Sequence, residues 1–151
     1  FAIINDALDE IDQADVIDTP TVAIDGKRYY DTALMPSFIL DQMTHTECQM
    51  FAVLEDGQAF PGQGVVSTYR TGYGVGLGEG ILATKRIRYQ KVRPNVWKRA
   101  MLGGFGRKEK GASILQAKRL FPFLAMKIGK NHNRAEALLL CLYGKQIFGR
   151  K

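Results

Sequence analysis

The expected fold of the end of the chain depends on one stretch of sequence, Lys130-Asn131-His132-Asn133-Arg134-Ala135-Glu136-Ala137-Leu138-Leu139-Leu140. Its apolar residues continue to Tyr143 and predict a buried helix over residues 133–148. His132 and Glu136 are four residues apart, so a helix places them on one face at its start. Two interpretations are open. Either Glu136 pairs with a nearby Lys or Arg while His132 caps the helix, or both side chains bind a divalent metal.

Length and composition indicate one globular domain over residues 1–151. The sequence is 46% hydrophobic and 24% charged, which excludes a wholly disordered chain. No apolar run approaches the roughly 20 residues that span a bilayer, and no signal peptide is expected because no basic segment opens the chain. Cys48 and Cys141 lack a CxxC partner and are expected to be buried free thiols in a reducing compartment.

Charge is unevenly distributed along the chain, whose formal net charge is +6. The acidic excess lies in residues 1–56, whereas the chain from Tyr69 onward is strongly basic. This asymmetry indicates a polyanionic partner, nucleic acid first, with a solvated basic face as the alternative. No membrane partner is expected.

The predicted elements are short strands early in the chain and helices late. Turn signals and apolar runs predict strands at 1–5, 16–18, 21–24, 50–54 and 88–92, with Asp25-Gly26 as a hairpin turn. Helices are expected at 31–44, from Asn95, at 108–121 and at 133–148, and a loop at 59–67. The apolar strand at 50–54 is expected to be buried on both faces. This order predicts a mixed α/β fold.

Alternating glycines form a distinctive segment at Gly72, Gly74, Gly76, Gly78 and Gly80. They match a dinucleotide-binding fingerprint poorly, because no strand directly precedes them and the third glycine falls at the wrong place. Close packing of a helix on a sheet, or of backbone on DNA, explains them better.

Three side chains could bind a metal: Glu55 at the end of a predicted strand, and His132 and Glu136 at the start of a helix. A strand-end carboxylate facing a helix-borne one suits a two-metal nuclease, whose cations lie roughly 4 Å apart and clamp the scissile phosphate. Oxygen-rich ligands favour Mg²⁺ or Mn²⁺, and an imidazole shifts the preference slightly toward Mn²⁺.

Three segments, in this order, resemble a known family. They are Val53-Leu54-Glu55-Asp56-Gly57-Gln58-Ala59-Phe60-Pro61-Gly62-Gln63-Gly64, Val92-Arg93-Pro94-Asn95-Val96-Trp97-Lys98 and His132-Asn133-Arg134-Ala135-Glu136-Ala137-Leu138. Together they resemble RuvC-type Holliday-junction resolvases, especially the phage and plant-chloroplast branch. Val16-Ile17-Asp18-Thr19-Pro20 resembles the second hairpin of that branch, so the likeness spans about residues 16–144.

The resemblance implies an RNase H-like fold, with a mixed central sheet and flanking helices, and a homodimer. It implies Mg²⁺- or Mn²⁺-dependent hydrolysis of symmetrically placed phosphodiesters in four-way DNA. Glu55, His132 and Glu136 would bind the metal, and Lys108 or Lys110 would approach the cleaved strand. Residues 60–69 would face the junction centre, where an aromatic ring could stack on or wedge between bases. The residues expected to contact DNA are Phe60, Gln63, Ser67, Tyr69, Arg70, Trp97, Lys98, Arg99, Arg107 and Lys118. For Trp97, core packing is the favoured alternative.

The chain departs from the family at its amino-terminal end. The family begins with a strand of the Gly-Ile-Asp-Pro-Gly type, whose Asp bridges the metals, and no segment here matches it. Phe1-Ala2-Ile3-Ile4 resembles the strand after that motif, and Asp6 is a poor substitute for the Asp. We therefore expect an amino-terminal truncation, which would leave this chain able to bind metal but poorly able or unable to cut DNA. The alternatives are a catalytically silent junction-binding protein and an RNase H-like nuclease with another nucleic-acid substrate.

Overall fold

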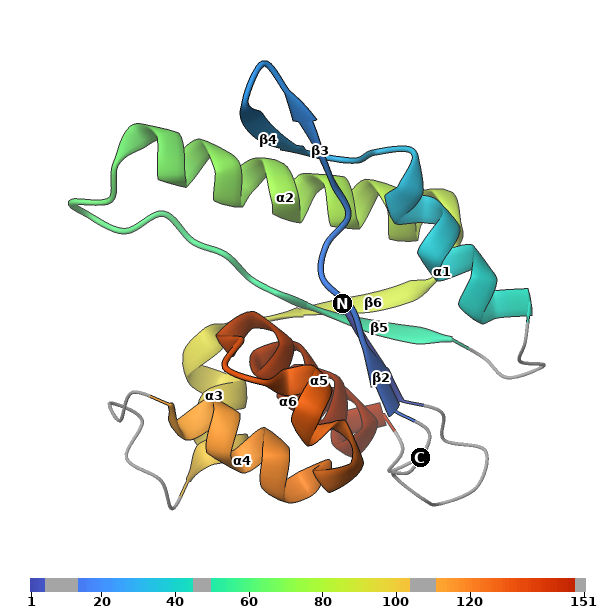
Figure 1. Cartoon of the computed structure of the whole chain (residues 1–151), viewed down its shortest axis with the longest axis vertical. Helices are drawn as coiled ribbons and strands as arrows, with labels where there is room; N and C mark the ends of the chain where they lie inside the picture. The colour runs from blue at the N-terminus through green and yellow to red at the C-terminus, as the bar shows by residue number, and fades with distance from the viewer. Residues whose placement is uncertain (5–13, 45–49, 104–110, 149–151) are drawn as a thin grey trace. The chain divides into compact units, whose positions relative to one another are not determined.

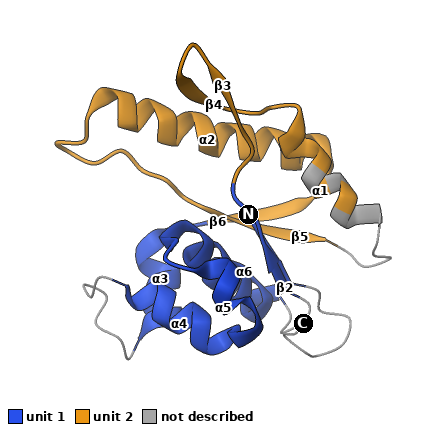
Figure 2. Cartoon of the chain, in the orientation of Figure 1, with its two compact units in different colours: residues 1–18, 92–151 blue, residues 19–91 orange. Residues whose placement is uncertain are grey.

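The computed structural model describes residues 1–4, 14–44, 50–103 and 111–148 (Figure 1). The chain divides into two compact units (Figure 2): unit 1 comprises residues 1–18 and 92–151, and unit 2 comprises residues 19–91. Helices and strands occur in both units, which confirms the mixed α/β class. The expected single central sheet is not found, because the described strands pair two by two into three separate sheets.

Unit 1 combines one small sheet with a group of helices. β1 (Ala2–Ile4) pairs antiparallel with β2 (Ala14–Val16), so that Ala2 lies opposite Val16. The helices are α3 (Pro94–Leu102), α4 (Ala112–Leu120), the short 3₁₀ turn η2 (Pro122–Leu124), α5 (Ala125–Ile128) and α6 (His132–Phe148). α6 contacts α3, α4 and α5 as well as both strands, and so lies at the centre of the unit.

The core of unit 1 is built around α6. The largest described side chains with less than 2% exposure are Val16, Trp97, Phe121, Ile128, Leu138 and Leu139, all in this unit. Burial of each such side chain contributes about 1.5–3 kcal/mol before entropy costs are counted. Because these side chains come from β2, α3, α5, α6 and the end of α4, their packing holds the elements of unit 1 in fixed positions.

The start of α6 lies one residue before its predicted position, and Asn131 caps it. The Asn131 side-chain oxygen accepts hydrogen bonds from the backbone N–H groups of Asn133 at 2.9 Å and Arg134 at 3.3 Å. A side-chain oxygen at this position satisfies donors that the first helical turn leaves without an intrahelical partner. The interpretation of His132 as the cap is therefore wrong, and His132 is the first residue of the helix.

α3 and the described part of α4 agree with the sequence patterns, whereas η2 and α5 were not predicted. α3 begins at Pro94, where the fixed φ of proline and its missing N–H suit the first helical position. The described part of the helix predicted at 108–121 is α4, and the predicted start lies outside the described residues.

Unit 2 begins with a hairpin. β3 (Thr21–Ile24) pairs antiparallel with β4 (Lys27–Tyr30), which confirms the predicted turn at Asp25-Gly26. Both turn residues have positive φ, 50° and 72°. A type I′ turn requires this conformation, and Asp-Gly adopts it readily.

The rest of unit 2 contains α1 (Leu34–Thr44), β5 (Phe51–Glu55), α2 (Val65–Thr84) and β6 (Arg88–Val92), whose last residue falls in unit 1. The side chain of Asp31 caps α1 by accepting hydrogen bonds from the backbone N–H groups of Ala33 and Leu34. β5 is not buried on both faces as expected: Phe51 is 36% exposed, since β6 is the only strand paired with β5 among the described residues.

The glycine-rich segment lies within α2. Because α2 begins at Val65, the predicted loop at 59–67 ends earlier than expected. A Cβ on Gly74 would come within 2.8 Å of the Tyr30 hydroxyl oxygen, and one on Gly78 would contact the Leu54 side chain at 3.5 Å. These two glycines let the helix lie close to β4 and β5, as predicted for packing of a helix on a sheet. Across the described ranges, none of the helices combines the length and apolar character needed to cross a bilayer.

Candidate functional site

Three helices of unit 1 each contribute one polar side chain to a contact at Glu136. Its Oε1 atom, on α6, lies 2.7 Å from the Lys98 ammonium of α3 and accepts a hydrogen bond from the Ser113 hydroxyl of α4 at 3.2 Å. We refer to Glu136, Lys98 and Ser113 as the Glu136 centre. The prediction that Glu136 pairs with a nearby Lys or Arg is thus confirmed. The carboxylate remains accessible, since its side chain is 28% exposed.

Trp97 supports the Glu136 centre from within the core. Its side chain is fully buried on the inward face of α3, together with Met101 and Leu102. The Lys98 ammonium lies 5.2 Å from the centre of the Trp97 ring, within the range of a cation–π interaction. Core packing of Trp97 is therefore confirmed. Its expected contact with DNA is wrong, because the ring has no exposed surface with which to reach a base.

Ser113 is a member of the site that the sequence analysis missed. The residue is only 5% exposed, and a buried hydroxyl is costly unless it finds a hydrogen-bond partner. Gln116 lies one turn further along α4, and its side-chain oxygen is a buried acceptor with no partner among the described residues. A serine in a basic helix carries no signal of this role until its partner on α6 is known.

A second set of contacts anchors the start of α6. Arg134 donates from Nε and Nη2 to the two carboxylate oxygens of Asp18, at 2.8 and 2.6 Å, and from Nη1 to the Lys127 carbonyl oxygen at 2.6 Å. The Asn131 amide also donates to Asp18, and Lys127 forms an ion pair with Asp15. Hydrogen bonding by the Arg134 guanidinium, the largest cause, holds the pKa of Asp18 below its ordinary value. The fold thus fixes the turn that carries His132.

The three proposed metal ligands are divided between the units. His132 is exposed on the first turn of α6 in unit 1, one turn before Glu136. Glu55 is half-buried at the end of β5 in unit 2. Within each unit, the described residues include no group of three His, Cys, Asp or Glu side chains close enough to hold a metal ion.

The two candidate metal ligands in unit 1, His132 and Glu136, nevertheless have side chains of the kinds that bind divalent cations. An imidazole and a carboxylate one helical turn apart on one face offer nitrogen and oxygen ligands suited to Mn²⁺ or Mg²⁺. Both contacts from Lys98 and Ser113 reach Oε1 of Glu136, so neither of them uses Oε2. The Lys98 ammonium already neutralises part of the Glu136 charge, so a divalent cation would have to share the carboxylate with it.

A tight turn precedes α2 in unit 2. The Gln63 N–H donates to the Phe60 carbonyl at 3.0 Å, with Pro61 at the second position and Gly62 at the third, where φ is 83°. This is the residue pattern of a type II turn. The turn leaves Phe60 64% exposed.

Side-chain contacts join this turn to the first residues of α2. Gln63 accepts a hydrogen bond from the Phe60 N–H and donates to the Ser67 hydroxyl, each at 3.2 Å. Tyr69 is 68% exposed and stacks on Tyr73, with ring centres 6.1 Å apart. The residues from Phe60 to the exposed Arg70 therefore present aromatic and polar groups at the surface of unit 2.

The remaining predicted contacts with DNA lie in unit 1. Arg99 is exposed on α3, and Lys118 is half-buried on α4. Arg107, Lys108 and Lys110 lie outside the described residues.

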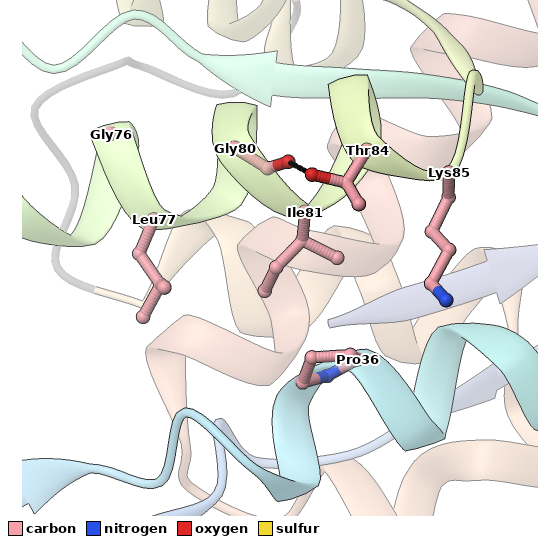
Figure 3. A pocket seen from close by; sticks show the side chains of 7 residues that line it. All are labelled: Pro36, Gly76, Leu77, Gly80, Ile81, Thr84 and Lys85. Atoms are coloured by element: carbon pink, nitrogen blue, oxygen red, sulfur yellow. Dashed lines mark hydrogen bonds between the residues drawn. The ribbon is translucent and has the colours of Figure 1, made fainter.

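A groove of about 300 Å³ lies between α1 and α2 in unit 2 (Figure 3). It is lined by Pro36, Gly76, Leu77, Gly80, Ile81, Thr84 and Lys85. The Thr84 hydroxyl donates to the Gly80 carbonyl of its own helix at 2.8 Å. Among the described residues that line the groove none is a carboxylate, and these residues form a mainly apolar surface beside the Lys85 ammonium.

Comparison with known proteins does not place the chain in a family. No protein-family model and no curated protein matches the sequence. Any functional assignment therefore depends on the residues themselves and on their contacts.

Proposed function

We propose that the chain is a structure-selective DNA endonuclease that resolves four-way junctions by metal-dependent hydrolysis of phosphodiesters, with an RNase H-like fold and as a homodimer. The observation that carries the proposal is the contact between Lys98 and Glu136. These residues belong to two of the segments that resemble RuvC-type resolvases, and those segments are far apart in the sequence. Their contact within unit 1 gives the resemblance a physical basis.

The residues of unit 1 have distinct roles in this proposal. Glu136 and His132 would hold Mg²⁺ or Mn²⁺, which when bound polarises the phosphate and stabilises its developing charge. Lys98 supplies a cation that can stabilise negative charge on the phosphate during hydrolysis. Arg134, through Asp18, keeps the first turn of α6 in place.

Contacts with DNA would come from both units. The exposed rings of Phe60 and Tyr69 offer surfaces for stacking on unpaired bases, and Arg70 and Arg99 offer contacts with phosphate. Because basic side chains release counterions when they bind phosphate, junction binding is expected to weaken steeply with salt.

Glu55 is proposed as a further metal ligand on the resemblance alone. Its half-buried position at the end of a strand is consistent with such a role. Glu55→Gln keeps the size of the side chain and removes its charge, so this variant tests Glu55 separately from the Glu136 centre.

The proposal is tested with a synthetic four-way junction, a linear duplex and an RNA–DNA hybrid, each incubated with the full-length protein in Mg²⁺ or Mn²⁺. Symmetric paired nicks in the junction, lost in Glu55→Gln, are expected. Tight junction binding without nicks would instead identify a silent junction-binding protein. Faster cleavage of the duplex or the hybrid would identify a nuclease with another substrate.

A further inference from the structure

Ser113 has an unusual combination of burial and partner. Among the described residues of unit 1 it is the one polar residue in the buried class, and its hydroxyl donates to Oε1 of Glu136 across the contact between α4 and α6. Neighbouring Ala112 and nearby Ala117 are also buried, and the side-chain oxygen of Gln116, one turn along the same face, is a buried acceptor with no partner among the described residues. A hydroxyl in such a place costs stability unless its hydrogen bond offsets the loss of water.

The two donors to Glu136 differ in stiffness. Lys98 reaches Oε1 through a long side chain with four rotatable bonds, whereas the Ser113 hydroxyl is one bond from the Cβ of a buried helical residue. Because α4 and α6 pack together, the position of the Ser113 oxygen relative to α6 is fixed by the core. The serine is thus the more rigidly held of the two donors to the carboxylate.

We propose that Ser113 is a positioning residue whose hydroxyl orients the Glu136 carboxylate and thereby strengthens the binding of a divalent cation to it. This inference rests on the proposed function for the identity of the cation. Neither contact at Oε1 uses Oε2, so Oε2 is the oxygen that the cation would bind. Residues that orient a metal ligand in this way commonly change metal affinity 10- to 100-fold when they are replaced.

The test measures Mn²⁺ binding to the full-length protein without DNA, from the electron paramagnetic resonance signal of free Mn²⁺. Ser113→Ala is expected to raise the Kd for Mn²⁺ about tenfold. Ser113→Thr, which keeps the hydroxyl, should stay within about threefold of the unmodified protein. Ser37→Ala is the matched control, since that hydroxyl bonds only to a carbonyl of its own helix in unit 2, and it should leave the Kd unchanged.

Thermal unfolding of the same variants separates positioning from a purely structural role. If Ser113→Ala folds poorly, Ser113→Cys keeps a side chain of similar shape with a weaker donor and should show the same weakened Mn²⁺ binding. Equal Kd values for the unmodified protein, Ser113→Ala and Ser113→Cys would overturn the inference. So would Mn²⁺ binding that is unchanged in Glu136→Gln.

The outcomes also distinguish this inference from the proposed function. Mn²⁺ binding that depends on Glu136 and Ser113, in a protein that cleaves no junction, would support the positioning role and refute the nuclease. Junction cleavage with the same Mn²⁺ dependence in the unmodified protein and Ser113→Ala would support the nuclease and refute the positioning role.

Discussion

The two units of the molecule use their apolar side chains differently. Unit 1 fully buries large residues such as Trp97, Phe121 and Leu138. Among the residues of unit 2 whose burial is described, the buried apolar side chains are Met35, Ile81, Leu82 and Ile87, and most of the exposed large apolar side chains of the described residues belong to this unit. Val66 and Tyr69, near the start of α2, are among the latter. Unit 1 thus has a well-packed apolar core, whereas unit 2 leaves many large apolar side chains exposed to solvent.

The polar contacts follow the same division. In unit 1, Glu136 and Asp18 bond to residues from distant parts of the sequence, which requires the packed core to bring them together. In unit 2, the contacts of Gln63 and Thr84 lie within one turn of chain, and the ion pair of Glu79 and Lys91 joins residues 12 positions apart. Chemistry that needs fixed geometry is therefore expected to depend on unit 1, and adaptable recognition of a partner is expected to depend on unit 2.

The difference between the two units should have its largest effect on the stability of the folded protein when an apolar side chain is shortened. Leu138→Ala in unit 1 should lower the free energy of unfolding by about 3 kcal/mol, since it opens a cavity at a fully buried site. Val66→Ala in unit 2 should change it by less than about 0.5 kcal/mol, because the Val66 side chain is 65% exposed. Urea denaturation followed by the fluorescence of Trp97, the only tryptophan, measures the first effect, and circular dichroism measures both. Similar losses of unfolding free energy in the two variants would contradict the proposed difference between the units.

The two units should also differ in how fast a thiol placed in each of them reacts. Cys141 on α6 is half-buried, not fully buried as expected, and desolvation raises the pKa of its thiol to about 11, so at pH 8 very little of it is the reactive thiolate. In a Cys48→Ser background, Cys141 should react with a maleimide more than about a hundredfold more slowly in the native protein than in concentrated urea. A thiol introduced by Val66→Cys should react at nearly the same rate in both conditions. Fast native labelling of Cys141 would contradict the account of a closed core in unit 1.

A smaller effect is expected at the anchor of α6. The folded-state pKa of Asp18 lies below its ordinary value because Arg134 donates hydrogen bonds to it, so this contact contributes stability above about pH 4. That contribution is lost as the pH falls through the folded-state pKa. Asp18→Asn should therefore lower the free energy of unfolding at pH 6, by at most about 1 kcal/mol because both side chains are partly exposed, and the difference should be smaller at pH 3.

Asp25→Asn is the matched control in unit 2. The Asp25-Gly26 turn accepts Asn equally well, so urea denaturation should show less than about 0.5 kcal/mol of change at either pH. A pH-independent loss in Asp18→Asn would show that the anchor acts through packing rather than charge.

Local sequence signals predicted several elements correctly. The Asp25-Gly26 hairpin and the apolar run of α6 depend on neighbouring residues alone, so their patterns were sufficient. α2 as a whole was missing from the predicted helices, because glycine is unfavourable in helices and the segment contains five of them. Contacts of Gly74 with Tyr30 and of Gly78 with Leu54 explain two of these glycines, and neither contact can be read from the sequence.

The candidate site was predicted only in part. The spacing of His132 and Glu136 correctly indicated one face of a helix, and Trp97 was correctly favoured as a core residue. The identities of the partners of Glu136 were not predicted, since Lys98 and Ser113 lie on other helices and meet it only through the packing of unit 1. The cap was misassigned because Asn131 and His132 are adjacent, and only the hydrogen bonds decide between them.

The most direct test of the central claim compares two glutamates, each paired with a lysine. Glu136 pairs with Lys98 in unit 1, and Glu79 pairs with Lys91 at 3.2 Å in unit 2. If the Glu136 centre carries the chemistry, Glu136→Gln should slow junction cleavage in Mn²⁺ by at least about a hundredfold while junction binding persists. Glu79→Gln should cleave at nearly the unmodified rate. Equal cleavage rates in the two variants would contradict the account.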